Sequence, residues 1–433
     1  MLNEEDIEKQ LQNFDVERFL RLQRYYNGQS DITQRTFNDT TKPNNKLVNN
    51  YAGYIVDIIQ GYFIGKPIQY VCEEDDYMEM VQDVLDKNET RTLDMQIAKQ
   101  VGIKGRCYEI VYVDENSQIQ LAKVDAENII PIYSNSIKPE IIGVIRVWEE
   151  NEDKQFEYYT DSEIIRGKVT KEDKKLEIID TQQHYFGEIP VIEYFNNDEG
   201  LGDFEKVITL IDAYDKTRSD TANDFEYFTD AYMVLKGCDI DVTADADGIK
   251  SMRKNRLLTL PQDADASFLL KNINDVALEN NNKRLREDIH KFSMTPDLTD
   301  TAFSGSISGI ALQFKMFGLE QIAQSKENFM RRGLKKRLRL ITRILNIKGA
   351  SYDSNDITMV FNRNMPVNLA EVVATMISLR GIISDSTLLS NLPMIDDPAY
   401  EMELREKEEG VSIDDYGVEN DTNGVDEDVS AEE

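Results

Sequence analysis

Histidine, cysteine and tryptophan are scarce in this chain of 433 residues, which contains two His, three Cys and one Trp. His184 and His290 stand apart from each other and from any cysteine pair, so neither a metal centre nor histidine-based catalysis is indicated. Cys72, Cys107 and Cys238 are an odd number at wide spacing, which fits neither a disulfide framework nor a Cys-x-x-Cys metal site. We therefore expect no catalytic residue, no metal, no cofactor, and synthesis in a reducing cytoplasm.

Long hydrophobic runs are missing as well. The best apolar stretch, residues 54–65, contains Asp57 and Gln60 and is shorter than the about 20 apolar residues that a membrane-spanning helix needs. The first ten residues, MLNEEDIEKQ, are acidic, unlike a signal peptide. We expect no membrane partner.

Basic residues are outnumbered, since 49 Lys and Arg face 81 Asp and Glu and leave a net charge of −32. DNA-binding surfaces normally neutralise phosphates with basic side chains, so this balance argues against a protein that grips DNA. It permits a protein that DNA slides past, because an acidic wall repels phosphates instead of forming long-lived ion pairs.

The overall composition is that of a globular protein, with 40% hydrophobic residues and with 17 Phe and 20 Tyr that can fill a core. The spacing of apolar residues predicts helices at residues 4–27, 46–64, two within 76–103, 203–230, 275–292, a very long one from 309 that stops at Gly349, and then 368–380, 385–391 and 398–409. Alternation predicts strands at 107–113, 118–124, 140–148 and 190–195, and a β-α-β unit with strands at 232–237 and 256–261 around a helix near 245–254. The fold class is α+β with an antiparallel sheet.

Two short motifs suggest chemistry but fit it poorly. GYFIGKP at 61–67 has three residues between its glycines instead of four, and Pro67 stands where a phosphate loop has Ser or Thr, so a helix stop explains it better. GSISG at 305–309 has Ile307 in the place of a nucleophile and no strand before it, which favours a flexible loop. Carboxylates are too numerous for any pair to be singled out as a nuclease site.

Two charged groups on predicted helices each allow two interpretations. Asp212, Asp215, Asp220 and Asp224 share one face of helix 203–230, which we interpret as a solvated face in preference to a channel wall. The long helix carries a basic cluster, seven bases in a stretch of thirteen residues: Arg331, Arg332, Lys335, Lys336, Arg337, Arg339 and Arg343. These bases either contact DNA or pair with acids of a neighbouring subunit, and the acidity of the whole chain favours the second interpretation.

Four strings, in order along nearly the whole chain, resemble the portal proteins of siphophages that infect Gram-positive bacteria. They are NKLVNNYAGYIVDIIQGYFIGKPIQY (45–70), DKTRSDTANDFEYFTDAYMVLKG (215–237), FSGSISGIALQFKMFGLEQIAQSKENFMRRGL (303–334) and GIISDSTLLSNLPMIDDPAYE (381–401). None is a chemical signature alone, but four in the correct order make coincidence improbable.

The resemblance implies a ring, usually of twelve subunits, at one capsid vertex, where it serves DNA packaging and ejection. It also implies the portal fold, with a β-containing wing, a helical-hairpin stem, a small α/β clip, a long wing helix and a helical crown. The segments would be the wing (1–200), the first stem helix (201–230), the clip (231–270), the second stem helix (271–293), the tunnel loop (294–308), the long wing helix with a return strand (309–364), the crown (365–409) and an acidic disordered tail (410–433). Residues 401–433 hold 14 acids and two bases, which suits a solvated tail.

In such a ring the loop nearest the DNA would comprise Thr299, Asp300, Thr301, Ala302, Phe303, Ser304, Gly305, Ser306 and Ser308. The implied partners are further copies of the chain, double-stranded DNA, the large terminase subunit, the major capsid and scaffolding proteins, and a head completion adaptor. The implied location is the portal vertex of the virion. Two alternatives stay open, namely a DNA-packaging enzyme with ATPase or nuclease activity, and a different ring-forming adaptor or scaffold component.

Overall fold

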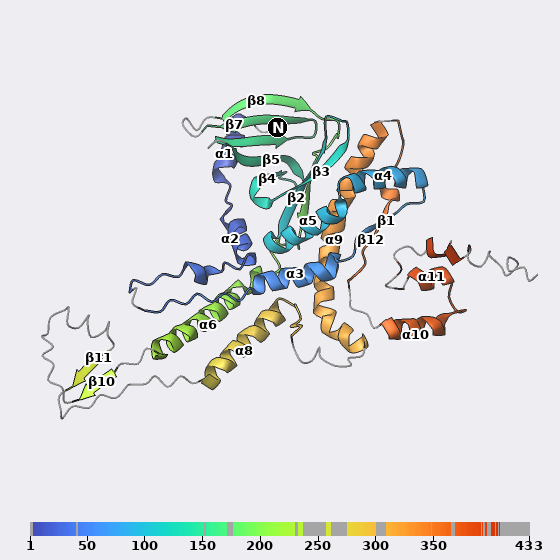
Figure 1. Cartoon of the computed structure of the whole chain (residues 1–433). Coiled ribbons are helices and arrows are strands. Elements are labelled where there is room, and N and C mark those ends of the chain that lie inside the picture. Colours follow the sequence, from blue (N-terminus) through green and yellow to red (C-terminus); the bar gives the residue numbers. More distant parts are fainter. Residues whose placement is uncertain are drawn as a thin grey trace, which may run out of the picture. The chain divides into compact units, whose positions relative to one another are not determined.

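The computed structural model describes residues 3–39, 42–150, 153–170, 176–229, 233–236, 257–260, 275–299, 309–347, 349–364, 369–390, 392, 395, 400–402, 404–405 and 407. The chain divides into two compact units, Met1–Asn364 and Met365–Glu433. Helices and strands both contribute to the first unit (Figure 1), so the predicted α+β class is confirmed.

The described helices begin and end at defined residues. The α-helices are α1 (Glu4–Asn13), α2 (Glu17–Tyr26), α3 (Tyr51–Ile64), α4 (Asp75–Lys87), α5 (Thr90–Lys104), α6 (Ile208–Thr229), α8 (Asp275–Phe292), α9 (Gly309–Ile347), α10 (Leu369–Leu379) and α11 (Asp385–Ser390). Short 3-10 helices are η1 (Asp31–Gln34), η2 (Ala126–Asn128), η3 (Glu205–Val207) and η5 (Ser354–Asp356).

Two antiparallel sheets make up the β-rich part of the first unit. One has three strands in the order β3 (Ile119–Val124), β2 (Arg106–Val113), β9 (Val191–Phe195). The other has five in sequence order, β4 (Ile129–Tyr133), β5 (Ile141–Glu150), β6 (Asp153–Tyr159), β7 (Glu163–Val169) and β8 (Leu176–Gln183). Two short strands pair elsewhere, β1 (Gln69–Val71) with β12 (Thr358–Val360).

The five-stranded sheet is buried on both faces near β4, β5 and β6. Neighbouring residues of a strand point to opposite faces, and accordingly Val144 and Ile145 belong to two different hydrophobic clusters. Ile145 packs with Ile7 of α1, whereas Val144 packs with Phe19 of α2 and with residues of the three-stranded sheet. The single helix expected over residues 4–27 is therefore wrong, because one straight helix cannot serve both clusters.

The long helix α9 crosses behind the three-stranded sheet and contacts β9 closely. A Cβ atom built on Gly333 would lie 2.3 Å from a ring carbon of Tyr194, so only glycine permits this approach. Met330, Leu334, Leu338 and other residues of the predicted apolar stripe are buried. The predicted helix from 309 is thus confirmed.

Residues 45–49 are extended and run antiparallel to α6, although a helix was expected to begin at Lys46. Three backbone N–H groups two residues apart donate to three side chains one helical turn apart: Asn45 to Asn223 (2.6 Å), Leu47 to Ser219 (2.9 Å) and Asn49 to Asp215 (2.8 Å). We call this the 45–49 ladder. The spacing of the donors on the extended segment matches that of the acceptors on α6, because two residues of extended chain span about 6.6 Å and four residues of helix about 6 Å. Helix α3 then begins after Asn50, whose side chain accepts the N–H of Gly53 at 3.0 Å.

Between α6 and α8 the chain forms two parallel strands, β10 (Met233–Lys236) and β11 (Leu257–Leu260). Parallel pairing requires a crossover connection, as in the predicted β-α-β unit. The helix expected near 245–254 lies outside the described residues.

The second unit contains α10 and α11, which correspond to the helices predicted at 368–380 and 385–391. Arg405 pairs with Asp385 at 2.6 Å. The helix predicted at 398–409 is described only in part, and the acidic segment 410–433 lies outside the described residues. Assignment of 365–409 to a crown stays a prediction.

Candidate functional site

Helices α6 and α8 lie side by side as a hairpin (Figure 1). At one end the hairpin enters the core of the unit, where Ile208 and Ile211 of α6 and Ile289 of α8 are buried. Ile289 is the one buried residue among the 18 of α8. Along most of its length α8 is therefore exposed to solvent in a single chain, whereas α6 is exposed at only a few positions.

The aspartates of α6 point toward residues 21–49. Asp215 is fully buried and accepts hydrogen bonds from Ser30 Oγ (2.5 Å) and from the Asn49 backbone N–H. Asp212 accepts the Tyr25 hydroxyl at 2.6 Å, and burial raises the pKa of Asp212. The solvated-face interpretation is wrong for these two carboxylates, which hold the N-terminal segment on α6.

Asp220 takes part in the same attachment. Its carboxylate pairs with Arg35 Nη1 at 2.6 Å, and another nitrogen of Arg35 donates to the backbone carbonyl of Asn45 at 2.7 Å. Arg35 thus joins α6 to the start of the 45–49 ladder. No hydropathy signal marks this role, since acids on one side of a long helix normally face water.

The end of α8 and the first residues of the predicted tunnel loop are fixed to α3. The Tyr54 hydroxyl donates to the Pro296 carbonyl (2.9 Å) and accepts the Leu298 backbone N–H (3.1 Å). Asp297 accepts two hydrogen bonds from Thr299, through its backbone N–H (3.0 Å) and its hydroxyl (2.6 Å). Burial opposes ionisation of Asp297, but these bonds hold its pKa below the ordinary value. Hydrogen bonds therefore hold the described residues 296–299 in place beside α3.

Thr299 is the one member of the predicted DNA-facing loop that the structure describes. Asp300, Thr301, Ala302, Phe303, Ser304, Gly305, Ser306 and Ser308 lie outside the described residues. Their contact with DNA stays a prediction.

Five of the seven bases in the predicted cluster on α9 have contacts within the chain. These are Arg331 with Glu327 (2.6 Å), Lys336 with the Val191 carbonyl (2.8 Å), Arg337 with Asp94 (2.6 Å), Arg339 with Glu188 (2.6 Å) and Arg343 with the Phe186 carbonyl (2.6 Å). Arg332 and Lys335 are exposed, and among the described residues neither makes a hydrogen bond or ion pair. Whether the exposed bases meet DNA or a neighbour stays a prediction.

Arg337 is fully buried between two acids from different elements. Its Nη1 lies 2.6 Å from Asp94 of α5, and its Nε lies 2.9 Å from Glu109 of β2. Tyr194 donates to Glu109 at 2.6 Å. Burial raises the pKa of Asp94 to about 6, against the pull of the guanidinium. Two carboxylates share one cation here, and the network joins α9 to a helix and a strand.

A groove of about 660 Å³ runs between α9 and β9. Apolar Phe329 and Phe195 line it together with charged residues of both signs, including Arg332 and Glu193. Desolvation lowers the pKa of Lys336, on the same wall, to about 8. The mixed charge of this groove does not suit a strongly anionic ligand.

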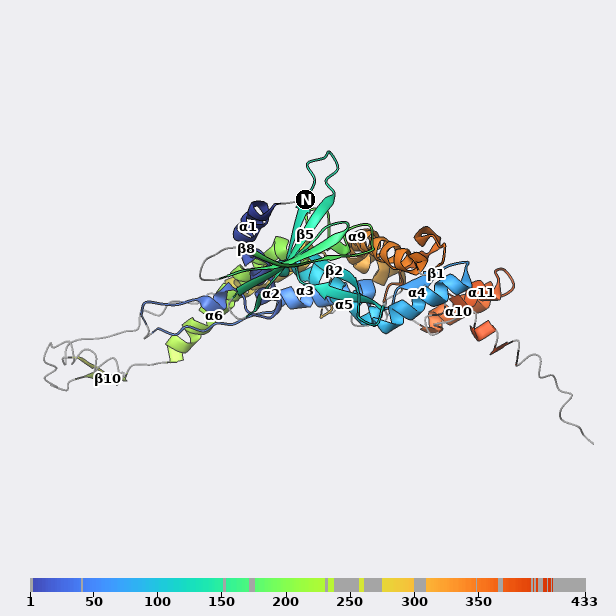
Figure 2. The same cartoon turned by 90° about the horizontal axis from the view of Figure 1, so that it is seen from above.

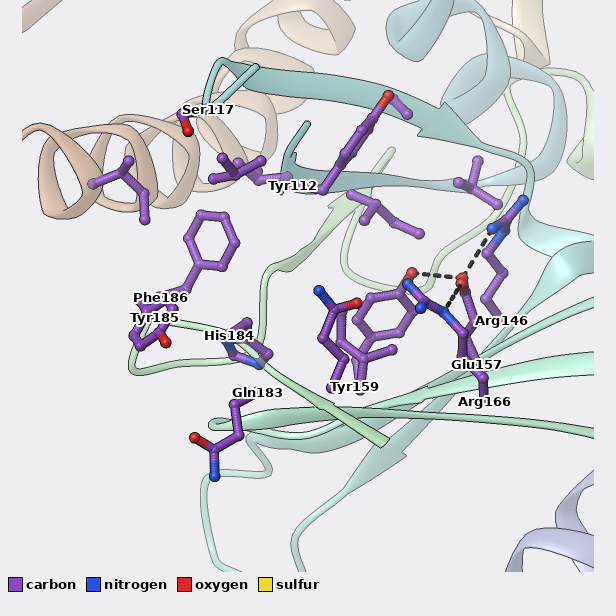
Figure 3. Close-up of a pocket in the computed structure, with 18 of the residues that line it drawn as sticks. Tyr112, Ser117, Arg146, Glu157, Tyr159, Arg166, Gln183, His184, Tyr185 and Phe186 are labelled. Atoms are coloured by element: carbon purple, nitrogen blue, oxygen red, sulfur yellow. Dashed lines mark hydrogen bonds and ion pairs between the residues drawn. The ribbon is translucent and has the colours of Figure 1, made fainter. Parts of the chain in front are cut away.

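A second cleft, of about 720 Å³, opens between the two sheets and the last turns of α9 (Figure 3). At its polar end Glu157 accepts hydrogen bonds from Tyr159 (2.7 Å), Arg146 (2.9 Å) and Arg166 (3.1 Å). Burial favours the protonated form, but these donors hold the pKa of Glu157 below its ordinary value. His184 bonds a backbone carbonyl at 3.1 Å, and burial lowers its pKa. The charged groups of this cleft thus bind one another and link β5, β6 and β7.

The described residues contain no group of three or more His, Cys, Asp or Glu side chains arranged to hold a metal ion. Across that same part of the chain, no helix combines the length and apolar character needed to cross a membrane.

Comparisons with known proteins cover nearly the whole chain. The family model for "Phage portal protein, SPP1 Gp6-like" matches residues 7–413. The chain is similar to the portal protein of Bacillus phage SPP1, at 24% identity over 466 aligned residues that cover 99% of this chain and 92% of the relative. It is also similar to the portal protein of Clostridium phage phiCD119, at 26% identity over 90% of this chain and 92% of the relative.

Solved structures give a weaker likeness. A chain from the neck of an empty gene transfer agent particle aligns with a TM-score of 0.43 at 12% identity, over 79% of this chain and 90% of its own length. A chain from the virion of a native gene transfer agent aligns with a TM-score of 0.42, also at 12% identity, over 88% of this chain and 94% of its own.

Proposed function

Because the chain belongs to the SPP1 Gp6-like family of phage portal proteins, we propose that its copies close into a ring at one capsid vertex, through which double-stranded DNA is packaged and ejected. The resemblance expected from the four sequence strings is confirmed. A portal protein is a structural component of the phage particle, so its place is the virion.

The observation that best supports the ring is the exposure of α8 in the α6–α8 hairpin. A helix such as α8, with one buried residue among 18, gains little from packing within its own chain. Repeated around a closed ring, such hairpins cover one another and form a barrel of helices. The hairpin would then be the stem, with residues 231–270 as the clip at its tip.

The net charge of the subunits determines how strongly such a ring would bind DNA. A subunit with a net charge of −32 cannot attract the duplex over long range. The segment 300–308, DTAFSGSIS, contains no basic residue, so contacts there would be weak and would depend little on salt. The ring would guide DNA without holding it, while the large terminase subunit supplies ATP hydrolysis and an adaptor closes the head.

Electron microscopy of the purified full-length chain tests the ring. We expect top views of a closed ring with a central hole, whereas monomers at high concentration would contradict the proposal. Purified rings without terminase should hydrolyse no ATP. Turnover that is lost on Lys66→Ala would favour a packaging enzyme instead.

A second test addresses the loop by complementing a phage that lacks its portal gene. Gly305→Pro should leave ring assembly and incorporation into procapsids near normal while blocking packaging, because proline restricts the backbone. Gly305→Ala is the matched control, since it adds one methyl group and keeps the backbone N–H. Normal packaging by Gly305→Pro rings would refute a role for loop movement, and equal loss of assembly would assign the loop a structural role.

A further inference from the structure

One face of α9 is exposed and carries bases without any acid. Arg332, Lys335, Arg339 and Arg343 are exposed and follow one another at intervals of three or four residues, which places them on a single stripe. We call this the α9 stripe. Two acids lie beside it: Glu188 is bound to Arg339 at 2.6 Å and lies 3.6 Å from Arg343, and Glu193 lines the same groove as Arg332 and is influenced by its charge. Four cations against these two carboxylates leave the stripe basic.

Helix α4 and the two residues before it carry the opposite charge. Residues 73–87 contain seven acids and one base, Lys87, which pairs with Asp83 at 2.6 Å. Asp75 and Asp76 stabilise the positive end of their own helix dipole. Glu79 and Asp86 lie further along α4, where the dipole gives no such benefit, and both are exposed. We call these exposed acids the α4 face.

These two surfaces cannot meet within one chain. Tyr77, on the buried side of α4, bonds Thr342 of α9 at 2.5 Å, so the acidic side of α4 points away from its own α9. Viewed from above, α4 lies along one side of α9 (Figure 2). The basic stripe and the acidic face thus form two separate surfaces with opposite charge.

We propose that the α9 stripe of one subunit docks on the α4 face of the next copy of this chain. A contact between two different patches is head-to-tail, and head-to-tail contacts generate a ring when the rotation closes. In a chain with an excess of acids, a basic stripe set against an acidic face lets two copies meet there without opposing like charges. The inference rests on the proposed ring and names the residues that set the order of its subunits.

Charge reversal tests the contact in the full-length protein. The stripe variant Arg332→Glu with Lys335→Glu and the face variant Glu79→Arg with Asp86→Arg should each raise the concentration needed for half-assembly at least about tenfold. Together in one chain the four changes restore opposite charges and should recover most of the assembly. Sedimentation velocity across a dilution series, at low and high salt, measures the ring fraction. Rising salt should weaken wild-type rings and strengthen those of either single-surface variant.

Lys9→Glu with Lys154→Glu is the matched control, because it reverses two exposed bases outside the stripe. This control should assemble like wild type. All variants change exposed side chains, so thermal unfolding of the unassembled subunit should be unchanged within a few degrees. Assembly of the stripe variant like the control would overturn the proposal, as would failure of the four-fold variant to recover. Failure of wild type to form rings would instead overturn the proposed function.

Disulfide cross-linking tests whether positions 79 and 335 of neighbouring subunits lie close together. Glu79→Cys and Lys335→Cys, placed together in a chain with Cys72→Ser and Cys238→Ser, should give a ladder of disulfide-linked multimers on oxidation. Either new cysteine alone should give no ladder, since Cys107 is buried. Normal rings without the ladder would overturn the docking contact while leaving the ring itself intact.

Discussion

The body around α9 and the α6–α8 hairpin are held together in different ways. In the body, α9 is fixed by a fully buried arginine, a glycine pressed against a tyrosine ring, and a long apolar stripe. In the hairpin, α8 buries only Ile289, and α6 is attached largely through hydrogen bonds to residues 25–49. The body is therefore held by contacts inside its own core, whereas α8 of the hairpin has surface left for neighbouring copies.

The largest effect is expected in the body. Arg337→Ala would leave Asp94 and Glu109 buried without their cation, which costs about 3–5 kcal/mol. The matched change Arg339→Ala removes an exposed arginine from Glu188 and should cost about 1 kcal/mol or less. Urea unfolding of the unassembled subunit measures both, and equal losses would show that burial of Arg337 is not what matters.

Acidity should act on the same network with the opposite sign to ordinary acid denaturation. The pKa of Asp94 rises from 3.8 to about 6 in the folded chain, so the folded state holds this proton more tightly than the unfolded state. That contribution is complete below about pH 4 and is lost as pH rises through 6, for a total on the order of 3 kcal/mol. Asp94→Asn should remove it. The difference in unfolding free energy between wild type and this variant, followed from pH 4 to 7, isolates the term, and a flat difference would refute it.

A smaller loss is expected where the N-terminal segment meets the hairpin. Asp215→Ala leaves the Ser30 hydroxyl and the Asn49 N–H without their acceptor, which should cost about 2 kcal/mol. Hydrogen exchange should then accelerate in residues 45–50 and in α6, while β2 and α9 stay protected. Uniform acceleration across the body would mean that the two regions do not unfold separately.

The smallest effect belongs to the exposed hairpin surface. Val276→Ser alters a side chain that is 69% exposed, so the unassembled subunit should change by less than about 0.5 kcal/mol. Ring assembly, followed by sedimentation, should weaken, because neighbouring hairpins would cover this position. A stability loss as large as that of Asp215→Ala would contradict the contrast between body and hairpin.

Most helices could be predicted from apolar spacing, including α4, α5, α8 and α9. Strands were harder, because β6, β7 and β8 carry many polar residues and their alternation is weak. The helix start expected at Lys46 failed for a tertiary reason, since residues 45–49 give their backbone N–H groups to α6 instead of to one another. Such an override of local preference leaves no local trace in the sequence.

The charged candidates show the same limit. Arg337 belonged to a cluster visible in the sequence, but its partners Asp94 and Glu109 lie far away along the chain. Both acids do occupy positions that the surrounding apolar pattern assigns to the interior, in α5 and β2. An acid at a core position implies a buried partner, which would have been a usable signal.

The 45–49 ladder also determines how the chain would respond to mechanical load. Its three hydrogen bonds lie across the axis of α6, so a pull along that axis strains all of them at once. A pull that lifts the segment away from the helix breaks them one after another. Sliding by a full turn would match Asn49 with Ile211, which has no acceptor, so the segment has a single complete register. The attachment is therefore strongest in shear and weakest in peeling.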